Sequence, residues 1–597
     1  MKRHHHLVAS LLLGLFTLQA QATQLLEPPS METPKKITVF VAKKIVTMDP
    51  SLPTATAVAV SDGKILSVGS LADLKPWTDQ YPTKIDRQFA DKVLYPGFVE
   101  AHGHPLLGGL TQTSLPLTYQ PLPNPWGPAF PGVSTLKAAI DQLKKYSAQI
   151  KDPAELLLSW GYDVAAMGKV PDRQLLDEAS TTRPMIIWDN SEHNMFLNSA
   201  AIARYKITGD AVKNIIGIGI DQAGNPNGQF LGASASKYIL SVAGKDMISP
   251  AKIPRAMLYS NDLAQQNGIT STSDMAFGVI DMAMEIEAMQ AITSSKAASL
   301  RIAPVALADS FVAKYGDQAV EQVKALKKLN TDRLMFHGVK FIGDDAYFAN
   351  TMKVDNPGYT DGHQGVIFYK SPQDFYQALK PWWDANFQIH VHSNGTGGNQ
   401  NTLNALQLLQ DSKPRFDHRF TLQHFGLPTT AMVMKVKALG AVASVNPAYF
   451  YTRAGIQAKD VGVDRISSAT RVGYLNKIGV VVSLHSDNPV APPRPLTEVW
   501  AVVNRLGIYT GDKQWAPAEA VSVADAMKMV TINAAYTVGI EDKVGTIEAG
   551  KYADFAVLGD DPQTVLPMKI KDVPVIATVL GGRVIPVSET KKERPLN

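Results

Sequence analysis

The middle of the chain repeats one pattern, a short apolar run typical of a buried strand followed by a helical stretch. Eight such runs occur, at residues 93–101, 269–274, 300–306, 334–341, 388–392, 419–424, 441–445 and 480–486. Amphipathic helical patterns lie between them, for example at 312–329, 371–386, 398–411 and 429–439. Strands that alternate with helices form a parallel sheet, and eight repeats predict an α/β fold with a (β/α)8, or TIM, barrel.

The stretch between the first and second runs is too long to be a simple loop. Residues 110–260 separate them and hold many prolines and aromatic side chains, among them Tyr119, Trp160 and Trp188. Loops longer than about 15 residues without secondary structure of their own are uncommon. We therefore expect a large insert after strand 1, an inserted lid subdomain at 110–260.

Both ends of the chain carry β-rich signals. Residues 36–93 contain three short strand-like runs with an Asp62-Gly63 turn, and residues 541–590 contain two more such runs. Chain termini often lie close together. The two ends therefore predict one small β-sandwich domain, made from 36–93 and 541–590, beside a barrel that spans 94–540.

The first 22 residues have the features of a secretory signal peptide. A basic start with Lys2 and Arg3 precedes an apolar run, and Ala20-Gln21-Ala22 gives a small-x-small cleavage pattern. The apolar run is shorter than the ~20 residues of a spanning helix. Cysteine is absent, which excludes disulfides, Cys metal sites and a lipid-modified Cys. We expect residues 1–22 to be removed from a periplasmic or secreted protein that is neither a lipoprotein nor membrane-bound after cleavage.

Polar residues gather where the predicted strands end, which is where a barrel of this kind carries its chemistry. They are His102 and His104 in the first run, Lys340 in the fourth, His390 and His392 in the fifth, His424 in the sixth, and His485 and Asp487 at the eighth. Alternate residues of a strand share one face, and neutral imidazole is the commonest ligand of transition metals. The pattern indicates a metal site on His102, His104, His392 and His424.

Lys340 and Asp487 add chemistry suited to hydrolysis. Burial lowers the pKa of a lysine, and the neutral amine reacts with carbon dioxide to give a carbamate that bridges two metal ions. Asp487 would bind metal and accept the proton of a water that the metal acidifies. Two plainer interpretations remain: Lys340 pairs with Asp344 or Asp345, and Asp487 caps the following turn.

The other histidines, and the formal charge, suggest no further ligand class. We interpret His337, His363, His418 and His390 as structural residues. The chain has 58 Lys and Arg residues and 54 Asp and Glu residues, so its net charge is small. No basic patch with interleaved aromatics occurs. The partner is therefore expected to be a small-molecule substrate and not a nucleic acid.

Several of these segments resemble the amidohydrolase superfamily, specifically its YtcJ-like or amidohydrolase-3 group. In chain order they are PGFVEAHGHP, SWGYD, DNSEHNMFLN, GVKFIGDD, QIHVHSNG, FTLQHF, HSDNPV and VTINAAYTVGIEDKVGTIEAGKYADFAVL. The resemblance runs through most of the chain. It implies a metal-dependent hydrolase that acts on carbon–nitrogen bonds, N-substituted amides and formamides among them.

The resemblance also implies roles for individual residues. One or two divalent ions, zinc foremost, would be held by His102, His104, Lys340, His392, His424 and Asp487, with Lys340 carboxylated at N6. It favours His392 over His390 as the ligand. Asp487 would be the catalytic residue. We expect His193 or Tyr162, both in the insert, to hydrogen-bond the carbonyl of the substrate.

Two other classes of function remain open. The same barrel and metal serve esterases, lactonases, phosphoesterases and deaminases, because the same hydroxide attacks all of these substrates. The second class is a non-catalytic periplasmic binding protein that retains the barrel. Barrel hydrolases with a β domain assembled from both ends often pair, so a homodimer is the alternative to a monomer.

Overall fold

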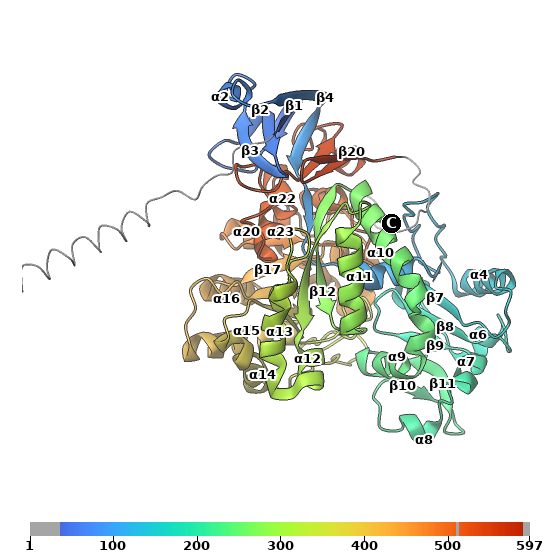
Figure 1. Ribbon diagram of the computed structural model, residues 1–597. Coiled ribbons are helices and arrows are strands. Elements are labelled where there is room, and N and C mark those ends of the chain that lie inside the picture. Colours follow the sequence, from blue (N-terminus) through green and yellow to red (C-terminus); the bar gives the residue numbers. More distant parts are fainter. Residues whose placement is uncertain (1–35, 509–512, 589–597) are drawn as a thin grey trace, which may run out of the picture.

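The computed structural model describes residues 36–508 and 513–588 (Figure 1). The predicted signal peptide, residues 1–22, lies outside the described residues, as do positions 589 and 590 of the predicted C-terminal β segment. Within the described part of the chain, no helix has both the length and the apolar character that a membrane crossing requires.

Eight parallel strands form the central sheet, as the sequence predicts. In order around the sheet they are β5 (Phe98–Glu100), β12 (Ile269–Phe277), β13 (Arg301–Leu307), β14 (Val339–Ile342), β15 (Ile389–Ser393), β16 (Thr421–His424), β17 (Val442–Val445) and β18 (Val482–Leu484). Every residue of β15, β16 and β17 is buried. Burial on both faces is what helix-covered parallel strands require, and it confirms the α/β fold class and the (β/α)8 barrel.

Helices follow most of the barrel strands and cover the outside of the sheet (Figure 1). They include α10 (Ile253–Gln266), α11 (Met282–Ser294), α12 (Ala308–Tyr315), α13 (Ala319–Leu326), α14 (Pro372–Asp384), α15 (Thr396–Ser412), α16 (Thr430–Leu439), α20 (Val472–Lys477), α21 (Pro495–Asn504), α22 (Val523–Met529) and α23 (Ile532–Thr537). The predicted helix at 312–329 is divided into α12 and α13 by a short 3-10 turn at Gly316–Gln318.

Two predicted strands differ from the structure, each at a glycine. The run at 334–341 is extended as a strand only from Val339, because Gly338 has a φ of +60° and interrupts the extended backbone. The run at 93–101 is divided at Gly97, where a Cβ atom would lie 1.9 Å from Oγ1 of Thr270. The first apolar run therefore supplies two strands to two different sheets.

The terminal β domain is a seven-stranded sheet built from both ends of the chain. Its order is β21 (Arg583–Pro586), β20 (Val575–Leu580), β19 (Phe555–Leu558), β4 (Thr83–Pro96), β1 (Ile37–Val46), β2 (Thr54–Ser61) and β3 (Lys64–Gly69). Antiparallel pairing of β19 with β4 joins the two ends, with Phe555 opposite Pro96. The blue and red strands at the top of Figure 1 are this sheet, which confirms a β domain assembled from both termini.

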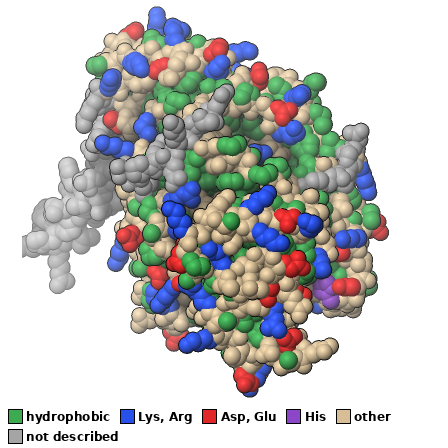
Figure 2. All heavy atoms as spheres, turned by 90° about the vertical axis from the view of Figure 1, so that its right-hand side faces the viewer, with side chains coloured by type: hydrophobic (Ala, Val, Ile, Leu, Met, Phe, Trp, Pro, Cys, Tyr) green, Lys and Arg blue, Asp and Glu red, His purple; other side chains and the backbone are tan. Residues whose placement is uncertain are grey.

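The insert after β5 has a six-stranded sheet of its own. Its order is β10 (Ile218–Ile220), β11 (Pro226–Phe230), β9 (Met195–Leu197), β8 (Met185–Asp189), β7 (Leu157–Tyr162) and β6 (Leu115–Pro116), and its helices include α4 (Leu136–Gln149), α7 (Ser199–Arg204) and α9 (Ala233–Met247). Separate apolar clusters around Trp160 and Tyr162 pack in this region. The insert lies beside the barrel (Figure 1), and charges of both signs are interspersed over this side of the molecule (Figure 2).

Candidate metal centre

The barrel closes at the ends of its first and last strands, and the predicted metal ligands stand at that seam. Gly103 and Asn488 form a parallel bridge. The backbone N–H of Asp487 donates to the carbonyl of His102 at 3.0 Å, and the N–H of His104 donates to the carbonyl of Asn488 at 3.0 Å. Two ligand-bearing segments from opposite ends of the barrel domain are thereby held side by side.

A buried carboxylate strengthens the seam. Glu100, the last residue of β5, accepts hydrogen bonds from the backbone N–H of His102 and from both the N–H and the hydroxyl of Ser486. Side-chain hydrogen bonds of Glu100 therefore reinforce the backbone hydrogen bonds of the seam. Together they fix the positions of His102 and Asp487.

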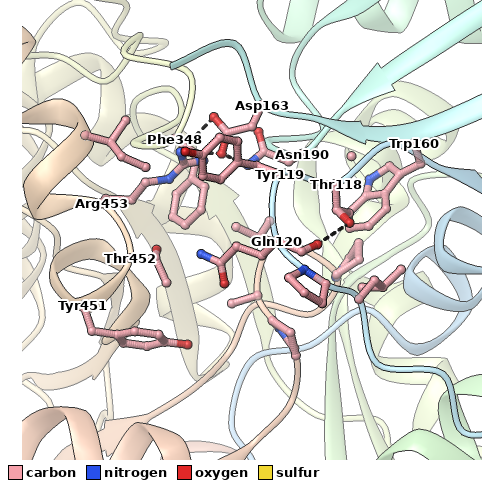
Figure 3. Close-up of a pocket in the computed structure, with 18 residues that line it drawn as sticks. Thr118, Tyr119, Gln120, Trp160, Asp163, Asn190, Phe348, Tyr451, Thr452 and Arg453 are labelled. Atoms are coloured by element: carbon pink, nitrogen blue, oxygen red, sulfur yellow. Dashed lines mark hydrogen bonds and ion pairs between the residues drawn. The ribbon is translucent and has the colours of Figure 1, made fainter. Parts of the chain in front are cut away.

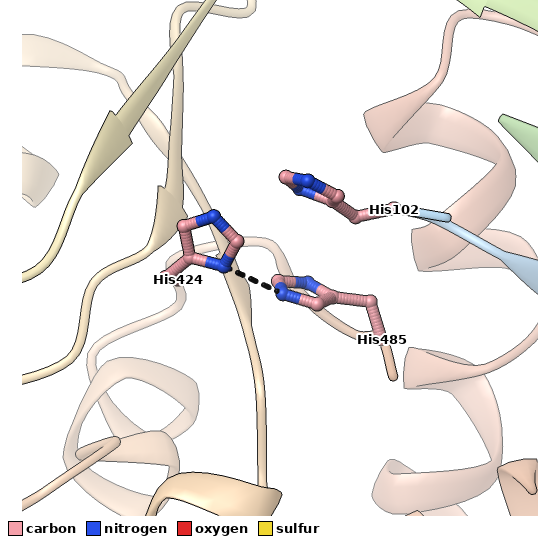
Figure 4. Close-up of side chains that lie close together, drawn as sticks. All are labelled: His102, His424 and His485. Atoms are coloured by element: carbon pink, nitrogen blue, oxygen red, sulfur yellow. Dashed lines mark hydrogen bonds between the residues drawn. The ribbon is translucent and has the colours of Figure 1, made fainter. Parts of the chain in front are cut away.

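Three imidazoles surround the carboxylate of Asp487. Its Oδ1 lies 3.3 Å from Nε2 of His102 and 3.2 Å from Nε2 of His104, and its Oδ2 lies 3.8 Å from Nδ1 of His424. His485 completes the group, with its Nε2 3.1 Å from Nδ1 of His424. Figure 4 shows His102, His424 and His485 converging from three strand ends.

The side chain of Gln423 determines which nitrogen of His102 faces this cluster. Its amide oxygen lies 2.7 Å from Nδ1 of His102, and its amide nitrogen lies 3.0 Å from Nδ1 of His390. His102 therefore donates from Nδ1–H, and its Nε2 lone pair points to Asp487. Such a partner behind the ring is a regular feature of metal-binding histidines.

His392 joins the cluster through the neighbouring strand β15. Its ring centroid is 4.5 Å from that of His424. Its Nε2 is engaged by Asn394 at 2.9 Å and by the carbonyl of Asp345 at 3.3 Å. Within the described ranges this leaves Nδ1 as the ring nitrogen available to a ligand.

His193 reaches the same region from the insert. Its Nδ1 forms a short ion pair with the carboxylate of Asp345, which follows β14. Its ring centroid lies 6.1 Å from that of His392. Burial lowers the pKa of His193, but the charge and hydrogen bond of Asp345 outweigh this effect and raise the pKa to about 9. The insert thus presents a protonated imidazole at the edge of the cluster.

Backbone strain accompanies the ligands. His424, Phe425 and Asp487 have φ values of 72°, 43° and 59°, in the left-handed region. Residues other than glycine cost free energy there and persist only where their surroundings hold them. The sharp turns after β16 and β18 direct the side chains of His424 and Asp487 toward each other.

The electrostatics of the cluster favour positive charge beside Asp487. Burial lowers the pKa of His104, but hydrogen bonds and charges of Asp274 and Asp487 outweigh it and raise this pKa to about 10. Burial raises the pKa of Asp487, yet the hydrogen bond and charge of His104, together with smaller contributions from His485 and Lys340, lower it to a net value below its usual range. Asp487 is therefore an ionised carboxylate in a site that demands a counter-charge.

Burial reduces the charge of Lys340 and keeps the rings of His102, His392 and His424 neutral. Burial lowers the pKa of Lys340 to about 7, an effect that Asp487 partly opposes. Its Nζ lies 3.4 Å from Nε2 of His102. Burial also lowers the pKa of His392, to about 3, and holds those of His102 and His424 well below the usual range. Uncharged nitrogen lone pairs thus face the carboxylate of Asp487.

This donor set fits a divalent cation. One potential ligand atom from each of His102, His104 and Asp487 lies within 4.8 Å of the others, and the same holds for His102, His424 and His485. Neutral imidazole nitrogens and a carboxylate oxygen are the donors that zinc and similar ions accept. His104 would release its proton on binding such a cation, and the cation would then supply the positive charge beside Asp487.

The structure brings together most of the predicted site residues. His102, His104, Lys340, His392, His424 and Asp487 form the cluster described above, and His193 borders it. Tyr162 is not brought there: it is buried in the core of the insert, and its hydroxyl donates to the carbonyl of Lys169 at 2.9 Å.

The plainer interpretations of Lys340 and Asp487 can also be compared with the structure. The carboxylate of Asp344 accepts backbone N–H groups of Lys353, Asn394 and Gly395, and that of Asp345 pairs with His193. Neither Asp344 nor Asp345 pairs with Lys340 among the described residues. Asp487 directs its carboxylate to imidazoles, and the turn after it is closed by its backbone carbonyl, which accepts from Val490.

Three residues near the centre were not among the predicted ligands. His485 lies with His102 and His424 in a group that could hold a metal ion. Its position two residues before Asp487 indicates this in the sequence, because alternate residues of a strand share one face. Asp274 in β12 lies 3.8 Å from Nδ1 of His104. Gln423 precedes His424 on β16. Neither of the latter two stands out in the sequence, because isolated Asp and Gln residues are common at strand ends.

A pocket opens between the insert and the barrel loops, beside the segment that follows Asp487 (Figure 3). The insert contributes residues 118–122 together with Trp160, Gly161, Asp163 and Asn190; the barrel contributes Phe348, residues 451–453, Ile456 and residues 489–492. Pro489 and Val490 directly follow Asp487 and Asn488 in the chain, so one wall of this pocket lies within a few residues of the cluster.

Known proteins are similar to this chain over most of its length. The profile of the amidohydrolase family matches residues 90–586. The N-substituted formamide deformylase of Arthrobacter pascens is 23% identical over 555 residues, which cover 90% of this chain and 96% of that protein. The protein LONG AFTER FAR-RED 3 of Arabidopsis thaliana is 24% identical over 560 residues, covering 90% of each chain.

A solved structure shares the fold. It is that of a metal-dependent hydrolase of Pyrococcus horikoshii OT3, described as uncharacterized, with a TM-score of 0.66 and 17% identity. The match covers 89% of this chain and 99% of that one. The barrel with its insert and terminal β domain is therefore an architecture found in other proteins.

Proposed function

Because this chain belongs to the amidohydrolase family, we propose that it is a metal-dependent hydrolase that breaks carbon–nitrogen bonds of non-peptide amides, N-substituted amides among them. The observation that carries the proposal is the meeting of His102, His104, His424 and the ionised Asp487 at the barrel seam. The name of the Arthrobacter relative, an N-substituted formamide deformylase, supports this bond class.

His102, His104, His392, His424 and Asp487 would hold one or two divalent ions, with zinc as our proposal. A bound ion of this kind supplies Lewis acidity, which lowers the pKa of water and polarises a carbonyl oxygen. Asp487 is ionised and lies among the ligands, so it is placed to accept the proton of the attacking water. The same carboxyl group then donates a proton to the leaving nitrogen.

Lys340 is proposed to be carboxylated at N6. Its pKa of about 7 leaves much of the amine unprotonated near neutrality. A neutral amine adds to carbon dioxide, forming a nitrogen–carbon bond and releasing one proton, and the product offers two oxygen donors. Lys340 lies beside His102, so these oxygens would extend the ligand set to a second ion.

His193 is the residue proposed to contact the substrate. It comes from the insert, carries a proton because of Asp345, and lies near His392. A protonated imidazole donates a hydrogen bond to a carbonyl oxygen. We propose that it orients the substrate carbonyl toward the ligand cluster.

The test is the Asp487→Asn variant of the metal-loaded protein. Wild type should hydrolyse at least one member of a panel of N-formyl and N-acyl amides, and the variant should lose about 10²- to 10⁴-fold in kcat, as general acid–base catalysis predicts. Its metal content should stay near that of wild type because the histidines remain. Turnover by colorimetric amine release and elemental analysis measure both quantities.

Asp561→Asn is the matched control. Asp561 is also a buried carboxylate, but it binds Tyr95 and Lys44 in the terminal β domain. This variant should keep wild-type kcat. A wild-type rate in Asp487→Asn would refute the assigned role of Asp487, and hydrolysis of matched esters without any amide would refute the assigned bond class.

A further inference from the structure

The chain has four buried arginines in its described part, and one of them is only partly hydrogen-bonded. All three guanidinium nitrogens of Arg183, Arg301 and Arg505 donate to protein oxygens. Arg453 is 1% exposed and uses only Nη1. Its Nε and Nη2 have no hydrogen-bond partner among the described residues.

The occupied side of Arg453 explains why the guanidinium keeps its position. Nη1 donates to both carboxylate oxygens of Asp163, at 2.9 and 2.7 Å. Asp163 also accepts from the N–H of Ala166 and from the amide of Asn190. The guanidinium carbon lies 3.9 Å from the centroid of the Phe348 ring. The cation is therefore preorganised by its ion pair and by stacking.

The unoccupied side has the geometry of a carboxylate receptor. Nε–H and one N–H of Nη2 lie on the same edge of the guanidinium plane and point in parallel. Two parallel N–H donors match the two oxygens of a carboxylate, with greater strength than neutral hydrogen bonds. An unpaired buried donor is costly, so an acceptor on this edge would remove that cost.

Arg453 stands in the wall of the pocket beside the segment that follows Asp487. Pro489 and Val490 of that segment line the same pocket, and Figure 3 shows Arg453 on one side of it, with Trp160 on the other. The indole Nε1 of Trp160 is also buried without a partner in the described chain. Every unpartnered buried side-chain atom of the described pocket residues is thus an N–H donor, which calls for a ligand rich in acceptors.

The rest of the pocket wall is mostly apolar. It includes Leu122, Phe348, Ile456, Val490 and Ala491. A ligand that fits this surface has an apolar body with oxygen acceptors at its end.

We propose that Arg453 binds the carboxylate of the substrate, and that the substrates are amides whose nitrogen-bearing part is a carboxylic acid with an apolar side chain. N-acyl derivatives of apolar amino acids have this chemistry. The inference rests on the proposed amide hydrolysis, because it assigns the scissile bond to the cluster around Asp487. It adds a specificity residue between the helices α17 (Ala448–Tyr451) and α18 (Ala454–Val461), which follow β17.

The test compares binding of two matched probes to the Asp487→Asn variant of the full chain. The probes are N-acetylphenylalanine, as each enantiomer, and its neutral carboxamide, titrated by calorimetry. Charged hydrogen bonds of this kind correspond to roughly 10- to 100-fold in affinity. We expect the carboxylate probe to bind more tightly by that factor, and the same factor to appear in kcat/KM of the wild type.

Variants then assign the preference to Arg453. Arg453→Gln should reduce the ratio to within about threefold, while binding of the neutral probe changes little, and Arg453→Lys should be intermediate because lysine lacks the planar fork. Arg453→Gln combined with Asp163→Asn removes both charges and guards against misfolding from an unpaired buried Asp163. Arg505→Gln is the matched control, since Arg505 is equally buried and ring-stacked but fully bonded; it should keep the wild-type ratio.

The outcomes separate this proposal from the proposed function. Equal binding of both probes to Asp487→Asn, or an unchanged preference in the double variant, would overturn the role of Arg453. Tighter binding of the carboxylate without hydrolysis by wild type would support the receptor and refute amide hydrolysis. Hydrolysis of neutral amides alone would support the hydrolase and overturn the carboxylate site.

Discussion

At the scale of single residues, the site depends on side chains whose charge is set by burial. Lys340 shows this most clearly: an exposed lysine is a cation and cannot bind a metal ion, whereas burial brings the pKa of this one to about 7. Its nitrogen lies 3.4 Å from Nε2 of His102. If Lys340 is carboxylated as proposed, this single amine determines whether the cluster holds one ion or two.

We predict that Lys340→Met lowers the metal content. Methionine has a similar shape and no amine, so no carbamate forms, and the content should fall from about two ions per chain to about one. Elemental analysis of protein purified with and without added bicarbonate measures it. Lys435→Met, which changes a half-buried lysine on α16, is the control. Equal metal content in wild type and Lys340→Met would leave Lys340 as a plain amine.

The sequence predicts the ligand types but not the groups that orient them. His102, His104, His424 and Asp487 are recognisable because metal-binding side chains recur at strand ends. Gln423 and Asp274 are not, since their roles depend on the tautomer of His102 and the charge of His104, which only three-dimensional contacts determine. Arg453 is likewise recognisable only by the donors it leaves unpaired.

At the scale of elements, the first helix of the barrel positions a ligand. His104 is the N-terminal flanking residue of α3 (Pro105–Gln112), so the packing of α3 determines where this ring lies. A Cβ at Gly109 of α3 would stand 2.1 Å from the carbonyl oxygen of Ala256 on α10. Glycine at this position therefore allows α3 to approach α10 closely.

We predict that Gly109→Ala displaces α3 and weakens the metal site. Overpacking of this kind costs about 1–3 kcal/mol of stability, and affinity for zinc should fall with it. Gly244→Ala on α9 is the control, because nothing lies within 4 Å of its Cβ position; it should be neutral or slightly stabilising. Thermal unfolding and competition with a chelator measure the two effects. A neutral Gly109→Ala would mean that α3 has no such close contact.

The sequence predicts these elements with uneven success, for physical reasons. Apolar runs mark the barrel strands because parallel strands are buried on both faces. The run at 93–101 shows the limit: periodicity cannot reveal that one apolar stretch serves two sheets, since the division depends on contact between Gly97 and Thr270. The fourth strand is overpredicted for a similar reason, because Gly338 turns the chain within an apolar run.

At the scale of the whole molecule, one ion pair joins the barrel to the terminal β domain. Arg301 of β13 donates to both carboxylate oxygens of Asp554 at 2.6 and 3.0 Å, and both residues are buried. The carboxylate of Asp554 also accepts from the N–H of Gly581, and its carbonyl accepts from the N–H of Gly97. This pair links β13, the β20–β21 turn and the β4–β5 junction.

We predict that Arg301→Gln lowers the stability of the whole chain. Removal of one partner leaves a buried charge uncompensated, at a cost of about 3–5 kcal/mol. The combined change of Arg301→Gln and Asp554→Asn should cost less than the sum of the two single changes. Urea denaturation measures each step. Arg419→Gln, which breaks a more exposed pair with Glu541, should cost at most about 1 kcal/mol. Additive losses would show that Arg301 and Asp554 are not coupled.

The pairing of β4 with β19 has a consequence for biosynthesis. Pro96 faces Phe555 in the finished sheet, so a ribosome adds about 460 residues, roughly 20–90 s of translation, between the two partners. During that interval the edge of β4 that receives β19 lacks its native partner strand. The terminal β sheet therefore cannot close before residue 555 has been made.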